Sequence, residues 1–391
     1  MRTISRVNND EHGMVLFTSL LILSLLMALG VGSVVFVQNE HRITGNLRLG
    51  TAAFYFAEAG IEWGKEQIGL TTTNPPGPAD AIREFSAGSF STSLVSSRQV
   101  SALSGQVILR STGTAGASSH TVQAQVTKIY DLADAALVLR GNSRGVNFTG
   151  DSFYLSGFDY DPTTGAAVAG AKARLGITTG NAALLSQIGN NLAPLQRNLI
   201  VGSDENGAAI SVSTRMEVDT LAAFANDLCS APNAQVSSIA SNGSLSIANQ
   251  TWGSHANPQL RCIHGLPQSG YTVTVGNNFS GAGILVVKDA QFVSSGALHW
   301  EGLIIVSGNG VGFRISGQES KEITGAVIVN ETGTAVGPGD PLLDIQGTVR
   351  ILYSRFTLGA AASLIPAASL TSIYSWLPFY LNQDYWRSVT P

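Results

Sequence analysis

Among the residues that could form a covalent bond or bind a metal, two cysteines are the clearest. Cys229 and Cys262 are its only cysteines, and no CxxC or HxxxH spacing of the kind that binds zinc is present. In an oxidising compartment such a pair favours a disulfide, which would close a loop of about 34 residues and stabilise the fold by roughly 3 to 4 kcal/mol. Two unpaired thiols are the alternative.

Three carboxylates lie close together in the segment GDSFYLSGFDYD, namely Asp151, Asp159 and Asp161. Hard oxygen ligands of this kind suit calcium. The full twelve-residue calcium-loop pattern is absent, however, and Asp and Gly are also ordinary turn residues. We therefore expect no metal and no other cofactor, and these three residues are the candidates if a metal does bind.

A further set of polar residues could act on a polysaccharide, because acid–base chemistry on sugars needs carboxylates and cations on one face. The set comprises Lys288, Asp289, His299, Glu301, Arg314, Lys321 and Glu322. These residues do not recur at a spacing that would stack them, so solvation at the surface is the expected role of most. Neither Gly-rich segment matches a Walker loop. We expect that the protein is not an enzyme.

Composition limits the classes of partner. The chain has 43 glycines, 12% charged residues and a formal net charge of −4. This balance provides no basic patch of the kind that nucleic-acid binding needs, so nucleic acid is excluded as a partner. Low charge with abundant Gly, Ser, Thr, Asn and Val is typical of a β-rich extracellular protein with many tight turns.

The stretch from Met14 to Val37 contains no charged residue. As a helix it would be about 36 Å long, enough to cross a hydrocarbon core about 30 Å thick. A buried core helix is one alternative, but helices of soluble proteins almost always carry a polar face, and this stretch has none apart from Thr18, Ser19, Ser24 and Ser33. A cleaved secretory signal usually has a shorter apolar run, closely followed by an A-x-A site. We expect a transmembrane helix.

The leader MRTISRVNNDEHG is short and polar, and it ends at Gly13 directly before the apolar run. It resembles the class III signal of type IV pilins and of type II secretion pseudopilins. The resemblance implies that a membrane-embedded prepilin peptidase cuts between Gly13 and Met14, and that the apolar helix is retained. Arg2 and Arg6 agree with a cytoplasmic N-terminus under the positive-inside rule.

Most pilins carry Glu at the fifth position of the mature chain, and this chain has Thr18 there. In that family the Glu is understood to pair with the N-terminal amine of a neighbouring subunit. Thr18 has no carboxylate for such a pair. The departure therefore favours a minor subunit that primes or caps a filament.

Residues 38–70 are predicted to continue the helix as a periplasmic stalk. Apolar or small residues recur there with alternating spacings of four and three, which form one stripe expected to dock a globular head. The stripe is Ile43, Leu47, Gly50, Phe54, Ala57, Ile61, Gly64 and Ile68. Glycines 45, 50, 60 and 64 weaken a helix, so we expect close packing or flexibility at these positions.

The segment HRITGNLRLGTAAFYFAEAGIEWG resembles the N-terminal region of the PilX family of minor pilins. The residues that match are Arg42, Gly45, Asn46, Ala53, Ala57, Glu58, Ala59 and Gly60. With the leader and the apolar run, the resemblance covers roughly residues 10–68. A solvated helix charge is the alternative role for Glu58.

Residues 71–130 are predicted to form a layer of antiparallel strands. TTTNPPGPAD ends the helix because adjacent prolines cannot continue it. FSTSLVS, GQVILRSTG and HTVQAQVTKIY then alternate polar and apolar residues as half-buried strands do. The layer resembles the sheet that pilins lay across the stalk helix.

Residues 131–391 are predicted to form a β-rich head. GILVV at 283, GLIIV at 302 and GAVIV at 325 begin 19 and 23 residues apart, which favours the stacked coils of a parallel β-helix. An antiparallel sandwich is the alternative. We expect a helical insertion near 182–233. A terminal group of aromatic residues is expected to seal a core or cap a solenoid: Tyr374, Trp376, Phe379, Tyr380, Tyr385 and Trp386.

The expected fold class is α+β, and the expected function is that of a PilX-like minor pilin, a tip or priming subunit whose head serves adhesion or partner binding. It would lie in the inner membrane with its head in the periplasm, and on the pilus after assembly. Expected partners are the prepilin peptidase, major and other minor pilins, membrane lipid and a pilus-tip adhesin. The alternatives are a type II secretion pseudopilin-like subunit and a membrane-tethered β-helix that binds or degrades carbohydrate.

Overall fold

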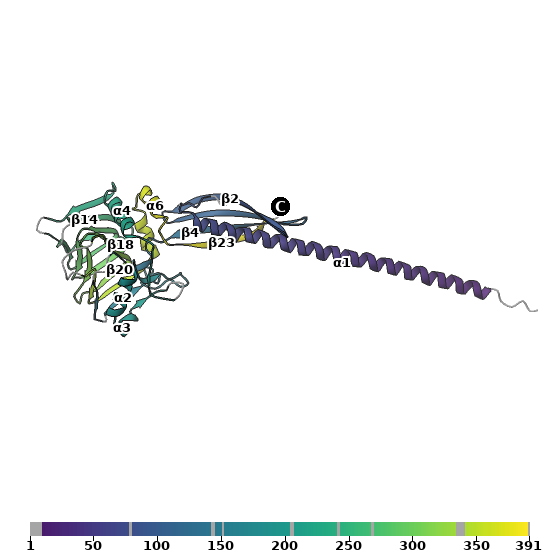
Figure 1. Cartoon of the computed structure of the whole chain (residues 1–391), viewed down its shortest axis with the longest axis horizontal. Coiled ribbons are helices and arrows are strands. Elements are labelled where there is room, and N and C mark those ends of the chain that lie inside the picture. The colour runs from purple at the N-terminus through teal and green to yellow at the C-terminus, as the bar shows by residue number, and fades with distance from the viewer. Residues whose placement is uncertain are drawn as a thin grey trace, which may run out of the picture.

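The computed structural model describes residues 10–77, 80–141, 145–150, 152–203, 207–240, 243–266, 270–333 and 341–389, with the side chains of the first helix described from Met14 onward. A long helix carries an antiparallel sheet along its second half, and a larger β-rich head lies beyond that sheet (Figure 1). The fold is α+β. Residues 1–9 of the expected leader and the calcium candidate Asp151 lie outside the described residues.

Helix α1 runs from Asp10 to Leu70 without interruption, so the apolar run and the predicted stalk form one helix. Its 61 residues correspond to a length of about 92 Å. It begins inside the expected leader and ends before Pro75 and Pro76, neither of which can donate a backbone N–H to continue it.

The sheet along the helix is antiparallel with the strand order β1-β2-β3-β4-β23. Its strands are β1 (Ala81–Phe85), β2 (Gly88–Ser101), β3 (Ser104–Ala115), β4 (Ser118–Tyr130) and β23 (Phe379–Val389). Alternate residues of β3 and β4, such as Leu109 and Val126, are buried in a core that also contains Ala57, Ile61 and Ile68 of α1. The predicted alternation is thus confirmed in these two strands.

The expectation that all of 131–391 belongs to the head needs correction at its C-terminal end. Strand β23 pairs with β4, from Phe379 opposite Tyr130 to Val389 opposite Thr121. Without β23, β4 would be an edge strand with unpaired backbone groups. Trp386 also packs edge to face on Phe54 of the helix, with ring centroids 5.7 Å apart. The last strand therefore attaches the end of the chain to the stalk.

The head is built from two sheets of parallel strands. The larger sheet contains β5 (Ala135–Arg140), β7 (Phe153–Ser156), β8 (Leu175–Thr179), β9 (Ile200–Val201), β10 (Ile210–Val212), β11 (Ala234–Ser238), β13 (Thr251–Trp252), β14 (Gln259–His264), β16 (Phe279–Lys288), β18 (Leu298–Gly308), β20 (Lys321–Glu331) and β22 (Val349–Leu352). The smaller sheet contains β6 (Val146–Thr149), β12 (Ser244–Ile247), β15 (Thr272–Val275), β17 (Gln291–Ser294), β19 (Gly312–Ile315) and β21 (Leu343–Gln346). From β15 to β22 consecutive strands alternate between the sheets, so the chain winds from one sheet to the other.

The repeated glycine marks the same place in three successive strands. Gly283 pairs with Gly302, and Gly302 pairs with Gly325, both in parallel register. Their φ angles are 122°, 125° and 148°, a region that disfavours residues with a Cβ. Leu303, Ile304, Ile305 and Val306, which follow Gly302, are fully buried. The 19- and 23-residue repeat therefore places one glycine per winding at a tightly packed backbone position.

The chain enters the larger sheet at an interior strand, β5, and the smaller sheet at one end, β6. Strand β5 pairs with the second half of β20, β6 pairs with β21, and β7 pairs with β22. The GVNFTG segment (145–150) thus continues the smaller sheet, and the SFYLSG segment (152–157) continues the larger sheet. Strands β10 and β11 lie at the two ends of the main strand order of the larger sheet, β10 next to β8 and β11 next to β14.

The expected helical insertion near 182–233 is only partly helical. It contains α2 (Ala182–Asn191), α3 (Pro194–Arg197) and α4 (Val218–Cys229), but also β9 and β10, which extend the larger sheet. These strands are too short for their alternation to be read from sequence. Helices α5 (Arg355–Ala362) and α6 (Ala367–Ile373) precede β23, and α5 packs on the larger sheet.

Candidate functional site

The first half of α1 has no partner in the described part of the chain. From Met14 to Leu49 every residue is exposed, and the most apolar 18-residue window has a mean hydropathy of 2.7 with none of it buried. Among the described residues this is the one helix long and apolar enough to cross a membrane. In Figure 1 it projects away from the head as a bare rod. Such an apolar surface requires a cover outside this chain.

Thr18 lies on this bare part of the helix. Its hydroxyl donates to the backbone oxygens of Met14 and Val15, at 2.9 and 3.0 Å. The side chain is thereby satisfied within its own helix. It presents no negative charge at the surface, where a Glu would.

The PilX-like motif residues divide between two environments. Arg42 and Asn46 are exposed on the bare helix, whereas Ala57 is fully buried against the sheet. Glu58 is half-buried and, with Glu62 and Trp386, lines a hollow of about 460 Å³ between α1 and β23. The motif therefore straddles the point where the helix reaches the sheet.

The docking stripe is shorter than the spacing predicted. Ala57, Ile61, Gly64 and Ile68 are buried, but Ile43 and Leu47 are 59% and 67% exposed. The sheet ends before it reaches these residues, so the amphipathic pattern alone could not place the limit of contact. The N-terminal part of the stripe lies outside the contact with the sheet and is exposed.

Three glycines allow the helix and the sheet to approach closely. A Cβ on Gly60 would lie 2.6 Å from the Thr92 hydroxyl, and one on Gly64 would lie 2.8 Å from Leu109. A Cβ on Gly113 of β3 would overlap the helix backbone at Ala53. Gly45 and Gly50 have open space around them. Close packing thus explains the glycines at 60 and 64 but not those at 45 and 50.

Lys128 caps the C-terminal end of the helix from inside the sheet. Its fully buried Nζ donates to the backbone oxygens of Ile68, Gly69 and Thr71, at 2.9, 3.1 and 2.5 Å. A cation here satisfies carbonyls that the helix leaves unpaired and opposes the negative end of its dipole. Burial lowers the pKa of Lys128 to about 8. The Lys128 side chain thus ties the C-terminal end of the stalk helix to the sheet.

A buried ionic network joins the stalk sheet to the head. Asp131, just after β4, accepts from the guanidinium groups of Arg174 and Arg355, and the contact with Arg355 Nε is 2.9 Å. Arg355 also pairs with Asp159 at 3.3 Å. Burial by itself lowers the pKa of Arg355, but neighbouring Tyr353, Asp131 and Asp159 raise it above its ordinary value. These contacts tie α5 and the loop before β8 to the end of the stalk.

Two of the calcium candidates, Asp159 and Asp161, accept hydrogen bonds from other groups of the chain. Asp159 accepts from the backbone N–H of Arg355 at 2.8 Å and from its guanidinium, so both of its oxygens are engaged. Asp161 accepts from the backbone N–H of Thr163 at 2.7 Å, as turn residues commonly do. The two carboxylates serve a junction and a turn respectively.

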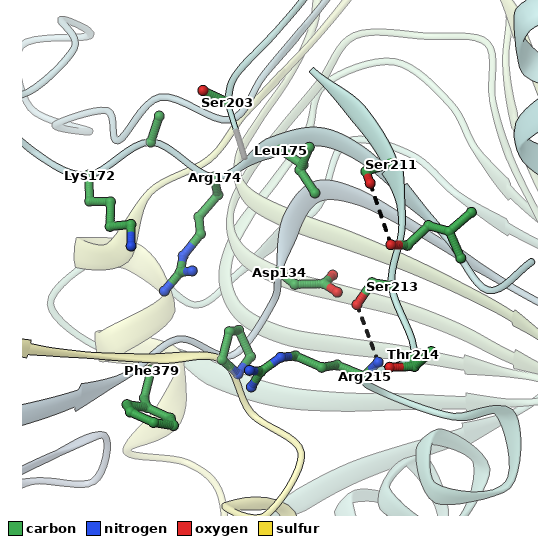
Figure 2. Close-up of a pocket in the computed structure, with 13 residues that line it drawn as sticks. Asp134, Lys172, Arg174, Leu175, Ser203, Ser211, Ser213, Thr214, Arg215 and Phe379 are labelled. Carbon is green, nitrogen blue, oxygen red and sulfur yellow. Dashed lines mark hydrogen bonds between the residues drawn. The ribbon is translucent and has the colours of Figure 1, made fainter. Parts of the chain in front are cut away.

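A hollow of about 600 Å³ opens at the same junction (Figure 2). Lys172, Arg174 and Arg215 reach it from segments around β8 and β10, and Asp134 lies at its base. Two of these cations already have partners, because Arg174 pairs with Asp131 and Arg215 donates to the backbone oxygen of Leu377. The hollow is therefore a seam between the head and the stalk in which two of the three cations are already engaged.

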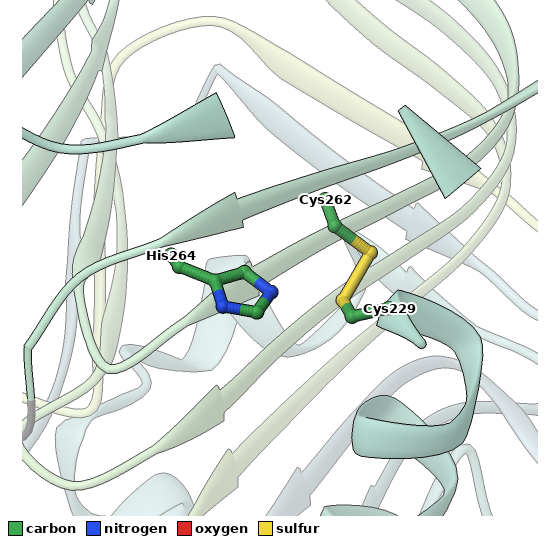
Figure 3. Close-up of side chains that lie close together, drawn as sticks. All are labelled: Cys229, Cys262 and His264. Atoms are coloured by element: carbon green, nitrogen blue, oxygen red, sulfur yellow. A yellow bond between two sulfur atoms is a disulfide. The ribbon is translucent and has the colours of Figure 1, made fainter. Parts of the chain in front are cut away.

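Cys229 of α4 and Cys262 of β14 form a disulfide, with Cα atoms 5.5 Å apart, as the cysteine count predicted. His264 lies beside it (Figure 3). Among the described residues these three are the group close enough to share a metal ion. Both sulfurs are bound to each other, so neither is available as a thiolate ligand. The disulfide fastens α4 to the larger sheet.

No protein-family model matches the chain, and no curated protein matches it. A similar solved structure is the crystal structure of the competence-associated pilin ComZ from Thermus thermophilus, which is 12% identical over 87% of this chain and 97% of that chain, with a TM-score of 0.26. A similarity at this TM-score does not by itself establish a shared fold.

Sequence reasoning missed the residues that hold the helix to the head. Lys128 carried a signal, because it occupies a position in HTVQAQVTKIY where the alternation calls for an apolar, inward-facing residue. Asp131, Arg174 and Arg355 carried none, since the two arginines lie 43 and 224 residues from their shared partner Asp131. Their meeting depends on the path of the chain through the whole head.

Proposed function

We propose that this protein is a minor pilin, a membrane-anchored subunit of a type IV pilus whose head is displayed for binding. The observation that carries the proposal is the contrast along α1. Its apolar first half is wholly exposed, while its second half is fixed to the sheet by buried glycines, apolar side chains and Lys128. A helix of this kind suits a subunit stored in the inner membrane and later packed among other helices in a filament.

The proposed maturation step is cleavage between Gly13 and Met14 by a prepilin peptidase. The mature chain would then begin with the exposed apolar helix. With Thr18 in place of the usual Glu, this subunit would lack the carboxylate that pairs with a neighbour's N-terminal amine. A priming or tip position, in contact with major and other minor pilins, fits that lack.

We further propose that the periplasmic head is a parallel β-helix, presented at the pilus tip for adhesion or for binding a tip adhesin. The parallel register of β14, β16, β18 and β20, and the alternation of strands between two sheets, support this architecture. A solenoid exposes a long lateral surface, because each coil repeats the same packing and adds to one continuous face. Such a surface suits binding.

The test is the mass and N-terminal sequence of the mature protein from sheared surface filaments, beside the same measurement on membranes. We expect a chain that starts at Met14 with a methylated amine and is present in the filaments. Gly13→Val should leave an uncleaved chain in the membrane. The matched variant Gly32→Val, inside the apolar run, should be processed normally.

Two results would redirect the proposal. A chain processed at Met14 that remains with the membrane and is needed for export of a secreted protein would identify a secretion pseudopilin instead. An intact Met1 start confined to membranes would overturn the pilin proposal and favour a tethered carbohydrate-binding β-helix.

A further inference from the structure

A row of polar side chains crosses the outer face of the larger sheet. It is formed by neighbours in parallel register on six adjacent strands. In order, these are Thr251, Ser280, His299, Glu322, Arg350 and Tyr154. The expectation that His299 and Glu322 do not stack was wrong, because they are 23 residues apart, the spacing of Gly302 and Gly325, and pair in the same register. Each of the six is exposed or half-buried. Each strand therefore adds one hydrogen-bonding group to a continuous line.

A hollow of about 560 Å³ lies over the first part of this row. Thr251, Ser280, His299 and Glu322 line it, together with Asn278. The hydroxyls of Thr251 and Ser280 are 3.1 Å apart and can each make further hydrogen bonds. The hollow is thus floored by donors and acceptors from neighbouring coils.

An aromatic ring stands beside the row. Phe356 of α5 is 60% exposed and stacks on His255, with ring centroids 4.8 Å apart and planes 2° from parallel. His255 Nδ1 lies 2.9 Å from Glu301, whose other oxygen lies 3.3 Å from His299 of the row. The ring is therefore held in place through the same contacts that reach the floor of the hollow.

The charges along the row are balanced. Arg350 pairs with Glu322 at 2.9 Å, and Glu301 lies between two histidines. A row with no excess of positive charge does not favour a polyanion. The ligand chemistry it fits is uncharged and rich in hydroxyl groups.

The sheet itself excludes a peptide strand as the occupant of this row. The interior strands β16, β18 and β20 have partners on both sides, so they have no free backbone edge to which a peptide strand could add. Recognition here must use side chains. Their spacing of about 4.8 Å, set by the distance between strands, is close to the length of one sugar unit in an extended chain.

We propose that this row, with Phe356 as a stacking platform, is a binding site for an uncharged, extended glycan. Successive sugar rings lie across successive strands and exchange hydrogen bonds with the side chains of the row. The apolar face of one sugar rests on the Phe356 ring. The site depends only on the head and is independent of whether the chain is a pilin.

The test is titration calorimetry of the full-length protein in a zwitterionic detergent without sugar groups. The probes are chitohexaose, cellohexaose and mannohexaose, with a sulfated hexasaccharide for comparison. We expect binding of at least one neutral hexaose, and at least tenfold weaker binding by Phe356→Ala and by His299→Ala. Leu195→Ala, at an apolar residue of α3 that is 78% exposed, and His41→Ala, on the bare helix, should bind like the wild type.

Glu322→Gln keeps the size of its side chain and provides a second test if Phe356→Ala fails to fold. It should also weaken binding, while its melting temperature stays close to that of the wild type. Absence of binding to all three neutral hexaoses at millimolar concentration would overturn the proposal. So would equal binding by the wild type and all row variants, or tighter binding of the sulfated probe.

Discussion

Replacing Gly302 with alanine tests whether the repeated glycine is required by the winding of the head. Gly302 lies in the middle of β18 with φ at 125°. It pairs with Gly283 on one side and Gly325 on the other. An added Cβ would overlap the backbone oxygen of Gly283 in the next strand. The substitution therefore meets both a strained backbone and a neighbouring main chain that has no flexible end to move.

The size of the effect follows from these two causes. Holding a non-glycine residue in such a backbone region costs roughly 1 to 3 kcal/mol. Forcing a methyl group into a packed site costs about 1 to 3 kcal/mol more. We expect a loss of about 2 to 6 kcal/mol in the free energy of unfolding. For a chain of 391 residues this corresponds to a fall in melting temperature of roughly 2 to 7 °C.

The assay is thermal unfolding of the full chain in detergent, followed by circular dichroism in the β-sheet band. Gly189→Ala is the matched control, because Gly189 lies in α2 with open space around it. That substitution should raise stability by about 0.4 to 1 kcal/mol. If Gly302→Ala melted at the same temperature as the wild type, the inference that adjacent strands approach too closely at this glycine to admit a Cβ would be refuted.

Three further predictions concern the end of the stalk, the disulfide of the head and the junction between stalk and head. Lys128→Met should destabilise the protein, and the difference in stability from the wild type should grow from pH 8 to about 10.5. The pKa of Lys128 is lowered to about 8 in the fold, so over this range only the unfolded chain still holds the proton and wild-type stability rises with pH. Paired melting curves at pH 7.5 and 9.5 would measure this difference, and a difference that stays constant would refute the prediction. Reduction of the Cys229–Cys262 bond should lower the free energy of unfolding by roughly 3 to 4 kcal/mol, measured by chemical denaturation with and without reductant, and unchanged midpoints would contradict it. Asp131→Asn should leave Arg355 without its nearest carboxylate and lower the free energy of unfolding by about 3 to 5 kcal/mol. We expect faster hydrogen exchange in α5 and β23. Unchanged exchange there would show that the network does not hold the junction.

Local sequence patterns predicted the elements whose cause is local. The uncharged run from Met14 to Val37 could form only a long apolar helix, and that helix is present and bare. Alternation in the segments of β3 and β4 placed their inward residues correctly, because side chains of a strand point to opposite faces in turn. The repeat at 283, 302 and 325 likewise anticipated three strands in register. Two cysteines permitted a single pairing within the chain, and the fold forms it.

Only the tertiary structure decided which distant segments meet. Nothing in Phe379–Val389 indicates that it pairs with β4 rather than sealing the head, since a strand pattern does not name its partner. The polar row from Thr251 to Tyr154 is invisible in sequence, because its members become neighbours only when separate strands pair in register. The junction of Asp131 with Arg174 and Arg355 likewise depends on the path of the whole head. Short-range periodicity determines the elements of this protein, and the long-range pairing of its strands determines its surfaces.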